Sequence, residues 1–298
     1  MPMIHKREVV KLNERYKNKD DLIIGERIEL AMKGGPKRTS ITIVDHDTGE
    51  VLDEGHNRIL VPGSQSSACK QFGIEPAVLF PTYNSELELE NSYPDWSHEP
   101  ENEPLTCLWC VGQSGYLTSP GEVVAVDSKD RIAPTDDIMP FRYCDSEEDL
   151  TPAQREIYFG RKTDPDTGKI AYYFKKYDTE PQLHVIYLDG TEVGPDMWSV
   201  QTPQEVEVYV EMKLSITRTD LREYFDQVIG WDKAYVNTLS LCTAWYRDDI
   251  TENPDAEAGD SYGYHWYQDI IPFSKFNFTN KDLKELNKAI DFIYRVYY

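Results

Sequence analysis

Apolar and polar residues alternate along much of this chain, and a period of two residues is typical of β-strands. The longest alternating run is residues 205–216, whose apolar face carries Val206, Val208, Val210, Met212, Leu214 and Ile216. The opposite face carries Glu205, Glu207, Tyr209, Glu211, Lys213 and Ser215. We therefore predict a long strand with one face on a core and the other on water or a neighbouring subunit.

Residues 290–298 alternate in the same way, and one face of this run carries Ile290, Phe292, Tyr294, Val296 and Tyr298. An aromatic strand with an unpaired edge promotes aggregation, so this strand has to pair within a sheet or with another subunit. Shorter runs of β-forming residues predict further strands at residues 105–111, 122–126, 170–174, 184–188, 234–246 and 272–279.

Two turns of the same composition organise the predicted sheets. Residues 40–63 are typical of a β-hairpin followed by a third short strand, and a second hairpin is predicted at residues 162–176. Asp and Thr side chains hydrogen-bond to the backbone of tight turns, and Gly supplies the positive φ. A calcium loop would need Gly at its sixth position, whereas Gly is fifth in both turns. The candidate turn residues are Asp45, Asp47, Gly49, Asp164, Asp166 and Gly168.

Helices are expected to be short. Residues 65–72 follow a possible N-cap at Ser64 and precede Gly73, which predicts two helical turns. The sequence Thr151-Pro-Ala-Gln154 is a capping box with proline at the first helical position, and Gly160 is expected to end that helix.

The strongest helical pattern follows residue 219. Asp220 is the expected N-cap, Glu223 closes a capping box, and Gly230 ends the helix. The apolar face of this helix is formed by Leu221, Tyr224, Phe225 and Val228. Residues 8–33 are also compatible with a helix, with an interruption at Gly25.

These elements predict a fold that is mainly β with short helices, an α+β fold with a β-sandwich-like core. Long excursions rich in proline and acidic residues are expected to interrupt the core at about residues 76–104, 127–150 and 248–264. We expect a basic N-terminal arm at residues 1–39 and a β-sandwich-like body at residues 40–298.

Charge supports this division of the chain. The 298 residues include 31 Lys and Arg against 53 Asp and Glu, a formal net charge of −22. Residues 1–39 hold 10 basic and 6 acidic residues, a net charge of +4, which leaves −26 for the body. A basic arm suits an acidic neighbour such as another copy of the body, although a soluble terminus without a partner is the alternative. Lys6, Arg7, Lys11 and Arg15 are the candidate contacts of the arm.

Composition also excludes several classes of partner. The acidic charge argues against sequence-specific nucleic-acid binding, because phosphate contacts need clustered Lys and Arg. No apolar run approaches the ~20 residues of a membrane-spanning helix, and the N-terminus lacks the apolar core of a signal peptide. The five cysteines are odd in number and irregularly spaced, which indicates reduced thiols and cytoplasmic production.

The spacing of Cys107 and Cys110 is the one that suits a metal or a redox pair. A structural zinc site needs two further ligands, for which Cys144 and His98 are the nearest candidates along the chain. Because the pair lies in a strand-like run, two buried thiols are the favoured interpretation, and we expect no metal and no cofactor.

No assembled catalytic signature is evident. His46 and His56 flank the first hairpin without a neighbouring nucleophile of a known pattern. The acidic run Glu86, Glu88 and Glu90 could join Asp95 as a glycosidase pair, but a solvated acidic face is the favoured reading. The aromatic cluster at residues 262–267 suits an interface or a core, and less well a sugar-binding platform. We expect no enzymatic activity.

Two parts of the chain resemble structural proteins of large tailed bacteriophages. Residues 44–63, with an Asp-x-x-Thr-Gly-Glu turn and the segment Asn57-Arg-Ile-Leu-Val-Pro-Gly63, resemble the opening β-unit of such proteins. Residues 236–241, 271–278 and 292–298 resemble the closing pattern of neck, tail and baseplate proteins. The resemblance covers about a third of the chain, and Thr238-Leu-Ser240 departs from the acidic and glycine residues expected after Asn237.

The resemblance implies a non-enzymatic subunit of a virion ring in the neck (the head-to-tail connector), tail or baseplate, assembled in the host cytoplasm. Its partners would be copies of itself and other virion proteins such as portal, connector, tail or baseplate components. Ring contacts bury different patches on the two sides of each subunit. Besides the arm, the aromatic residues Tyr264, Trp266, Phe292, Tyr294 and Tyr297 are candidate subunit contacts.

Two other functions remain open. A glycan-binding tail or surface module would use Trp96 and the aromatic cluster at residues 262–267, because aromatic faces stack on sugars. A virion-borne hydrolase would use the acidic residues of the body as catalysts.

Overall fold

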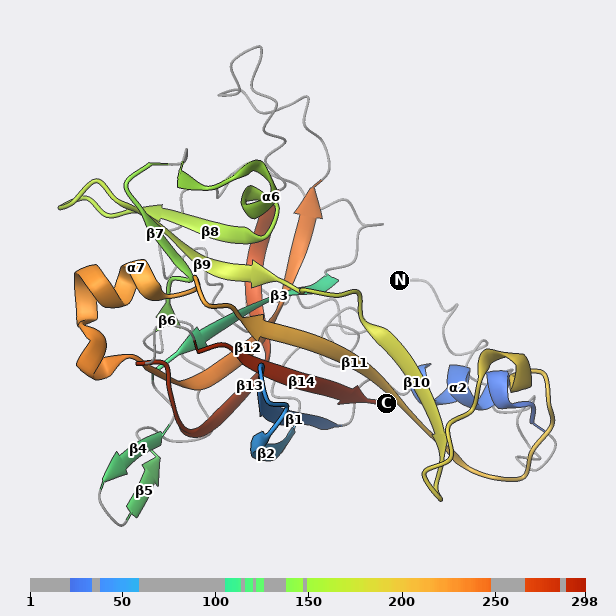
Figure 1. Ribbon diagram of the computed structural model, residues 1–298. Coiled ribbons are helices and arrows are strands. Elements are labelled where there is room, and N and C mark those ends of the chain that lie inside the picture. The colour runs from blue at the N-terminus through green and yellow to red at the C-terminus, as the bar shows by residue number, and fades with distance from the viewer. Residues whose placement is uncertain are drawn as a thin grey trace, which may run out of the picture.

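The computed structural model describes residues 22–33, 38–58, 105–113, 116–119, 122–125, 138–146, 149–247, 266–284 and 288–298. Two antiparallel sheets pack against each other in this part of the chain (Figure 1). The helices are few and short. The predicted fold class, mainly β with a β-sandwich-like core, is therefore confirmed.

The first sheet has five strands in the order β10–β11–β14–β1–β2, and all neighbours are antiparallel. Their bounds are Gln182–Tyr187, Val206–Ile216, Ile290–Tyr297, Arg38–Asp45 and Val51–Arg58, respectively. The C-terminal strand β14 lies in the middle, with β11 on one side and β1 on the other. The chain therefore satisfies the pairing of its terminal strand internally.

The second sheet has seven strands. Its main order is β13–β12–β3–β9–β7, with bounds Trp266–Asp282, Tyr235–Arg247, Leu105–Gly112, Ile170–Lys176 and Arg142–Cys144. β6 (Ile138–Met139) pairs with β3, and β8 (Tyr158–Thr163) pairs with β9. A separate hairpin is formed by β4 (Tyr116–Ser119) and β5 (Glu122–Ala125). Each of the eight predicted strand runs overlaps a strand of the structure, and five of them extend one residue beyond it.

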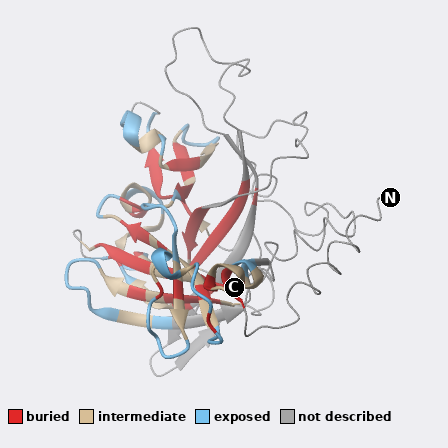
Figure 2. Ribbon diagram, turned by 90° about the vertical axis from the view of Figure 1, so that its right-hand side faces the viewer, coloured by how far each residue is buried: buried red, intermediate tan, exposed pale blue. Residues whose placement is uncertain are grey.

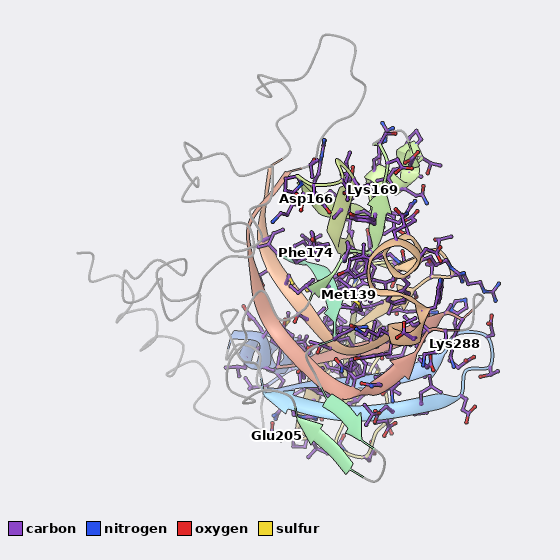
Figure 3. The ribbon with its side chains drawn as sticks, turned by 90° about the vertical axis from the view of Figure 1, so that its left-hand side faces the viewer. Met139, Asp166, Lys169, Phe174, Glu205 and Lys288 are labelled. Carbon is purple, nitrogen blue, oxygen red and sulfur yellow. The ribbon has the colours of Figure 1, made fainter. Side chains whose placement is uncertain are left out.

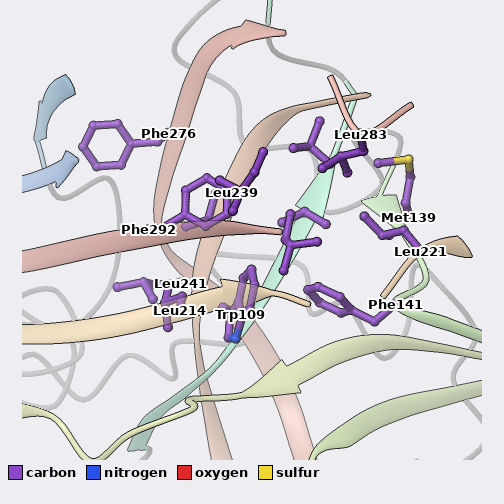
Figure 4. Packing of buried hydrophobic residues seen from close by; sticks show 14 of the residues in the cluster. Trp109, Met139, Phe141, Leu214, Leu221, Leu239, Leu241, Phe276, Leu283 and Phe292 are labelled. Atoms are coloured by element: carbon purple, nitrogen blue, oxygen red, sulfur yellow. The ribbon is translucent and has the colours of Figure 1, made fainter. Parts of the chain in front are cut away.

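The main core lies between the inner faces of the two sheets. Trp109 at its centre makes edge-to-face contacts with Phe141 and Phe292, with ring centroids 4.8 Å and 6.2 Å apart (Figure 4). From the second sheet, Phe276 packs against Tyr294 and Phe278 against Phe292. Alternation along each strand supplies these side chains, since every second residue points to the same face. Figure 2 shows the buried residues concentrated along the strands and the exposed ones in the connections.

The long strand β11 serves two cores. Its C-terminal residues Met212, Leu214 and Ile216 enter the main core between the sheets. Nearer its N-terminus, Val208 packs instead against Ile24 and Ile28 of helix α2 (Ile24–Lys33). The first sheet therefore extends beyond the second one, and α2 covers the extension (Figure 1).

Helix α2 belongs to the body and not to an arm. The amides of Ile24 and Gly25 donate to the carbonyls of Val200 and Trp198 at 3.0 and 2.8 Å. Gly25 does not interrupt the helix but lies in its first turn, where an added Cβ would be 3.3 Å from the Trp198 carbonyl oxygen. The boundary that we expected at residue 39 also falls inside β1. Of the predicted arm, residues 1–21 and 34–37 lie outside the described residues.

Both predicted hairpin turns are confirmed, and they share one hydrogen-bonding pattern. Asp45 Oδ1 accepts from the amides of Asp47 and Thr48, and Asp164 Oδ1 accepts from those of Asp166 and Thr167. Gly49 and Gly168 close the turns at φ values of 69° and 73°. The turns connect β1 to β2 and β8 to β9.

Two predictions about residues 127–160 are wrong in part. The excursion expected at residues 127–150 contains β6 and β7, and Phe141 between them is fully buried in the main core. The capping box at Thr151 is confirmed, but helix α6 (Pro152–Arg155) ends before Gly160, which lies within strand β8. Because this segment is polar, its sequence pattern gave no indication of the two short strands, which are stabilised by contacts with the core.

The helix predicted after residue 219 exists in altered form. One α-helical turn, α7 (Arg222–Tyr224), continues as a π-helical turn at Phe225–Ile229 and ends at Gly230 as expected. Asp220 does not cap it, because its carboxylate is buried and bound elsewhere, and Leu221 starts the helix with a positive φ of 66°. Glu223 binds Arg142 and closes no capping box. Tertiary contacts with the second sheet therefore override the local capping pattern.

The remaining short helices are 3-10 turns at Pro195–Met197 and Trp231–Lys233. The helix predicted at residues 65–72 and the excursions at residues 76–104 and 248–264 lie outside the described residues.

Candidate functional site

A buried network of charges joins the two sheets. The Nζ atom of Lys175 on β9 donates to the carbonyl of Ser215 on β11 at 2.6 Å and to Asp220 at 3.2 Å. The hydroxyl of Tyr158 donates to the other oxygen of Asp220 at 2.6 Å. Burial and the charge of Asp220 raise the pKa of Tyr158, so this hydroxyl remains a donor at neutral pH. Since the network is enclosed, it fixes the sheets and is not itself a binding site.

A hollow lies at the C-terminal end of β11. It has a volume of about 350 Å³ and is lined by His46, Ser215, Ile216, Thr217, Arg218, Thr219 and Ala289. A second hollow, of about 10 Å³, shares three of these residues and adds Arg222 and Lys288 to the lining. We call this region, with the turn at His46 and Asp47, the Arg218 end.

A half-open cluster of charges borders the larger hollow. His46 Nδ1 lies 3.0 Å from both carboxylate oxygens of Asp291, so the imidazole donates to the carboxylate. Lys213 Nζ lies 2.7 Å from Asp291 Oδ2. Burial alone would raise the pKa of Asp291, but the hydrogen bonds from Lys213, His46 and Ser215 outweigh it and lower the pKa below its ordinary value. Asp291 is therefore a carboxylate at neutral pH and holds His46 at the edge of the hollow.

Positive charge predominates in the lining of the two hollows at the Arg218 end. The cations Arg218, Arg222 and Lys288 are accompanied there by a single acid, Asp220, whose charge Lys175 compensates. Arg218 also reaches Asp47 at 2.6 Å, but both side chains of this pair remain about half exposed. In a chain with a net charge of −22, this is an unusual local surplus. It suits an acidic partner.

The opposite end of β11 carries the other unusual surface. We call it the α2 lobe; it comprises α2, β10 and residues 188–205, which connect β10 to β11. Arg27 anchors the lobe from inside, donating through Nε and Nη2 to the Thr202 carbonyl at 3.1 and 2.9 Å. The connection also folds back on β10, where the amide of Val193 donates to the carbonyl of Val185. These hydrogen bonds make the lobe a folded part of the body.

Exposed apolar side chains gather on the α2 lobe. Seven large hydrophobic residues are exposed in the described part of the chain, and five of them belong to this lobe. Leu188 is the most exposed of all, at 79%. The other four are Met32, Leu183, Met197 and Val200. Single exposed apolar residues need no explanation, but a concentration on one protruding part indicates a contact surface.

The same lobe is acidic. Residues 188–207 contain five acids and no Lys or Arg. Four of these acids are exposed, namely Asp189, Glu192, Asp196 and Glu205. A surface that combines apolar and acidic side chains suits a partner with complementary positive charge.

Three residues expected at a subunit contact lie elsewhere. Phe292 and Tyr294 are completely buried in the main core, so their assignment as contacts is corrected. β14 is the central strand of the first sheet, and its even-numbered residues lie on the face that packs against the second sheet. Tyr297 points to the outer face but is covered by its own chain: the Arg38 guanidinium lies 3.6 Å from its ring centroid.

The outer face of the first sheet is filled by its own side chains. The ring of His184 stacks on Tyr209, and Tyr209 contacts Tyr297 across β11 and β14. Ion pairs from Arg38 to Glu207 and from Arg295 to Glu211 continue this layer at 2.6 and 2.7 Å. These contacts join β10, β11, β14 and β1 across the outer face of the first sheet.

Several sequence candidates are not described by the structure. The arm residues Lys6, Arg7, Lys11 and Arg15, together with Tyr264, lie outside the described residues. Trp266 opens β13, but its side chain is not described. The acidic run at residues 86–95 and most of the aromatic cluster at residues 262–267 also lie outside the described residues.

The three cysteines whose side chains the structure describes, Cys110, Cys144 and Cys242, are buried. No group of three or more metal-binding side chains occurs among the described residues. Cys110 lies on the outer face of the second sheet, where its Sγ is 3.9 Å from that of Cys242. Cys144, the proposed further ligand, lies in the main core, and burial raises the pKa of its thiol to about 11. Of the predicted pair, Cys110 is buried, whereas the side chain of Cys107 is not described and His98 lies outside the described residues.

Comparisons with protein-family models, with curated proteins and with solved structures gave no match. Within the part of the chain that the structure describes, no helix has the length and apolar character needed to span a bilayer.

Sequence reasoning missed both ends of β11. The run of acids without any Lys or Arg at residues 188–207 was visible in the sequence. The Arg218 end had a weaker signal, because Lys288 joins Arg218 and Arg222 only through the pairing of β11 with β14.

Proposed function

We propose that this chain is a non-enzymatic structural subunit that assembles with copies of itself into a ring of a tailed-phage virion, in the neck, tail or baseplate. The observation that carries the proposal is the α2 lobe, where exposed apolar residues concentrate on a protruding part of a rigid β body. A soluble monomer gains nothing from such a surface, whereas a subunit buries it against a neighbour.

Two further features support an assembly role. The body is braced internally by the Lys175 network and by the aromatic core, which suits a part that must hold its shape under contact with neighbours. The resemblance of the first hairpin and of the C-terminal strands to phage structural proteins supports the virion assignment. Other virion proteins, such as portal, connector or baseplate components, are the partners expected beyond the ring.

The test is the mass of the purified chain in solution. We expect a closed oligomer, larger than the 34.5 kDa monomer, in sedimentation velocity and mass photometry. Substituting Leu188→Asp or Met197→Asp should shift it to monomer while far-ultraviolet circular dichroism shows that the fold is retained, because both side chains are exposed in the subunit. Ala153→Asp, on exposed helix α6, is the matched control and should leave the oligomer intact.

Location in the virion needs a separate experiment. Deleting residues 1–21 removes most of the basic arm but keeps α2, and we expect the truncated chain to be lost from purified particles while its melting temperature is unchanged. A chain that stays monomeric at concentrations on the order of 10 μM, where subunit interfaces form readily, contradicts the proposal.

A further inference from the structure

We propose that neighbouring copies pack head to tail, with the α2 lobe of one copy seated on the Arg218 end of the next. This inference rests on the proposed ring function and assigns the two surfaces that make the contact. The occupant of each surface is therefore a second copy of this chain.

Charge complementarity is the first argument. The connection from β10 to β11 presents Asp189, Glu192, Asp196 and Glu205 and contains no Lys or Arg. Within the lobe, Arg27 pairs with Glu205 at 3.4 Å and His184 with Glu192 at 3.1 Å. The lining of the Arg218 end presents Arg218, Arg222 and Lys288. Two bodies with a net charge of −22 repel each other at long range, so association requires a local match of this kind.

Shape is the second argument. The Arg218 end is hollowed, with a volume of about 350 Å³, and the α2 lobe protrudes from the sandwich with Leu188 and Met197 exposed. Apolar side chains of a projecting part fill such a hollow, and the charges around it then fix their register. The hydroxyls of Thr217 and Thr219 in the lining add hydrogen-bonding partners for the acids of the lobe.

The α2 lobe and the Arg218 end of one chain are too far apart to contact each other. They lie at opposite ends of β11, which has 11 residues and, at about 3.3 Å per residue, spans on the order of 35 Å. Figure 1 shows α2 and α7 on opposite sides of the ribbon, and Figure 3 places Glu205 and Lys288 far apart. Since the surfaces differ and face apart, the contact is heterologous, and such contacts close into rings or extend into filaments.

The experiment uses two charge-reversed variants of the full chain. The lobe variant carries Glu192→Lys and Asp196→Lys, and the end variant carries Arg218→Glu and Lys288→Glu. The control, Asp166→Lys with Glu156→Lys, makes the same charge change as the lobe variant, in the turn between β8 and β9 and at the C-cap of α6. Figure 3 shows Asp166 away from Glu205 and Lys288. Melting temperatures confirm that all three are folded.

Sedimentation velocity gives the decisive results. We expect each surface variant to weaken self-association at least tenfold and the control to leave it unchanged. Mixing the lobe variant with the end variant offers the intact pair of surfaces and the charge-swapped pair, so it should restore assembly beyond the monomer that each variant gives alone. Combining all four substitutions in one chain restores complementary charges and should recover a larger oligomer.

The outcomes separate this inference from the proposed function. A wild-type chain that is monomeric overturns both. A wild-type oligomer that both surface variants form as well as the control overturns the head-to-tail contact alone, and leaves the ring function with another interface. Homodimers of either single variant at wild-type strength would indicate a symmetric contact and overturn it too.

Discussion

Asp220 and Asp291 are both buried and both bind a lysine, but the exposure of their partners differs. The side chains of Asp220 and Lys175 are 0% and 2% exposed, so this pair is enclosed completely. Asp291 is 6% exposed, but its partners Lys213 and His46 are 43% and 45% exposed. A fully buried charge depends on its partners within the protein, because water cannot solvate it, whereas a half-exposed one exchanges partners with solvent. The first pair therefore holds the two sheets together, and the second can respond to pH and to a neighbour.

The largest effect is expected from Lys175→Met. The change leaves the carboxylate of Asp220 buried without its cation, which should lower the free energy of unfolding by about 3–5 kcal/mol in urea denaturation. Its matched control is Lys176→Met, whose exposed side chain should change the free energy of unfolding by less than about 0.5 kcal/mol.

The double variant Lys175→Met with Asp220→Asn sharpens the result. Removing both charges should recover a large part of the loss, because the cost of breaking a buried pair comes mainly from the charge left behind. If the single and double variants were equally unstable, the network would act through packing alone.

A smaller effect is expected from Asp291→Asn, about 1–2 kcal/mol at pH 7, since hydrogen bonds to a charged acceptor are lost. The pKa of Asp291 is lowered in the folded state, so its contribution is complete above the ordinary carboxyl pKa near 3.8 and is lost as the pH falls through the lowered value. The difference between wild type and variant, measured in urea from pH 7 downward, should therefore persist at pH 5 and disappear only when the pH falls below the lowered pKa of Asp291. A difference independent of pH would contradict the charge of Asp291 as the cause.

The smallest effect on stability is expected from His46→Gln. The imidazole is half exposed and Lys213 keeps its bond to Asp291, so the free energy of unfolding should fall by less than about 1 kcal/mol. A loss as large as that from Lys175→Met would remove the distinction between the enclosed and the half-open pair.

Local patterns predicted the elements that depend on neighbours in sequence. Alternation along residues 205–216 and 290–298 indicated β11 and β14, because the period of a strand is set by its own backbone. The two Asp-x-Asp-Thr-Gly turns were predictable for the same reason, since Asp45 and Asp164 bond to amides only two and three residues away.

Predictions failed where a distant partner competes with a local one. Asp220 has the sequence context of an N-cap, but Tyr158 and Lys175 bind its carboxylate from another sheet. The alternation at Phe292 and Tyr294 predicted a strand with one buried face. The position of β14 between β1 and β11 then decided that this aromatic face is the buried one. The placement of Phe141 in the core, within a polar segment, follows from its contact with Trp109 and not from its neighbours.

By itself, the sequence determined the strand periodicity, the turns and the mainly β class, because backbone geometry and short-range hydrogen bonds act within a few residues. Only the tertiary structure decided that β14 is central, that Asp220 is a tie between sheets, and that acidic and basic surfaces lie at opposite ends of β11. The physical reason is that strand pairing brings together residues as distant as His46 and Asp291, and the energies that select such pairs depend on burial, which no local pattern contains.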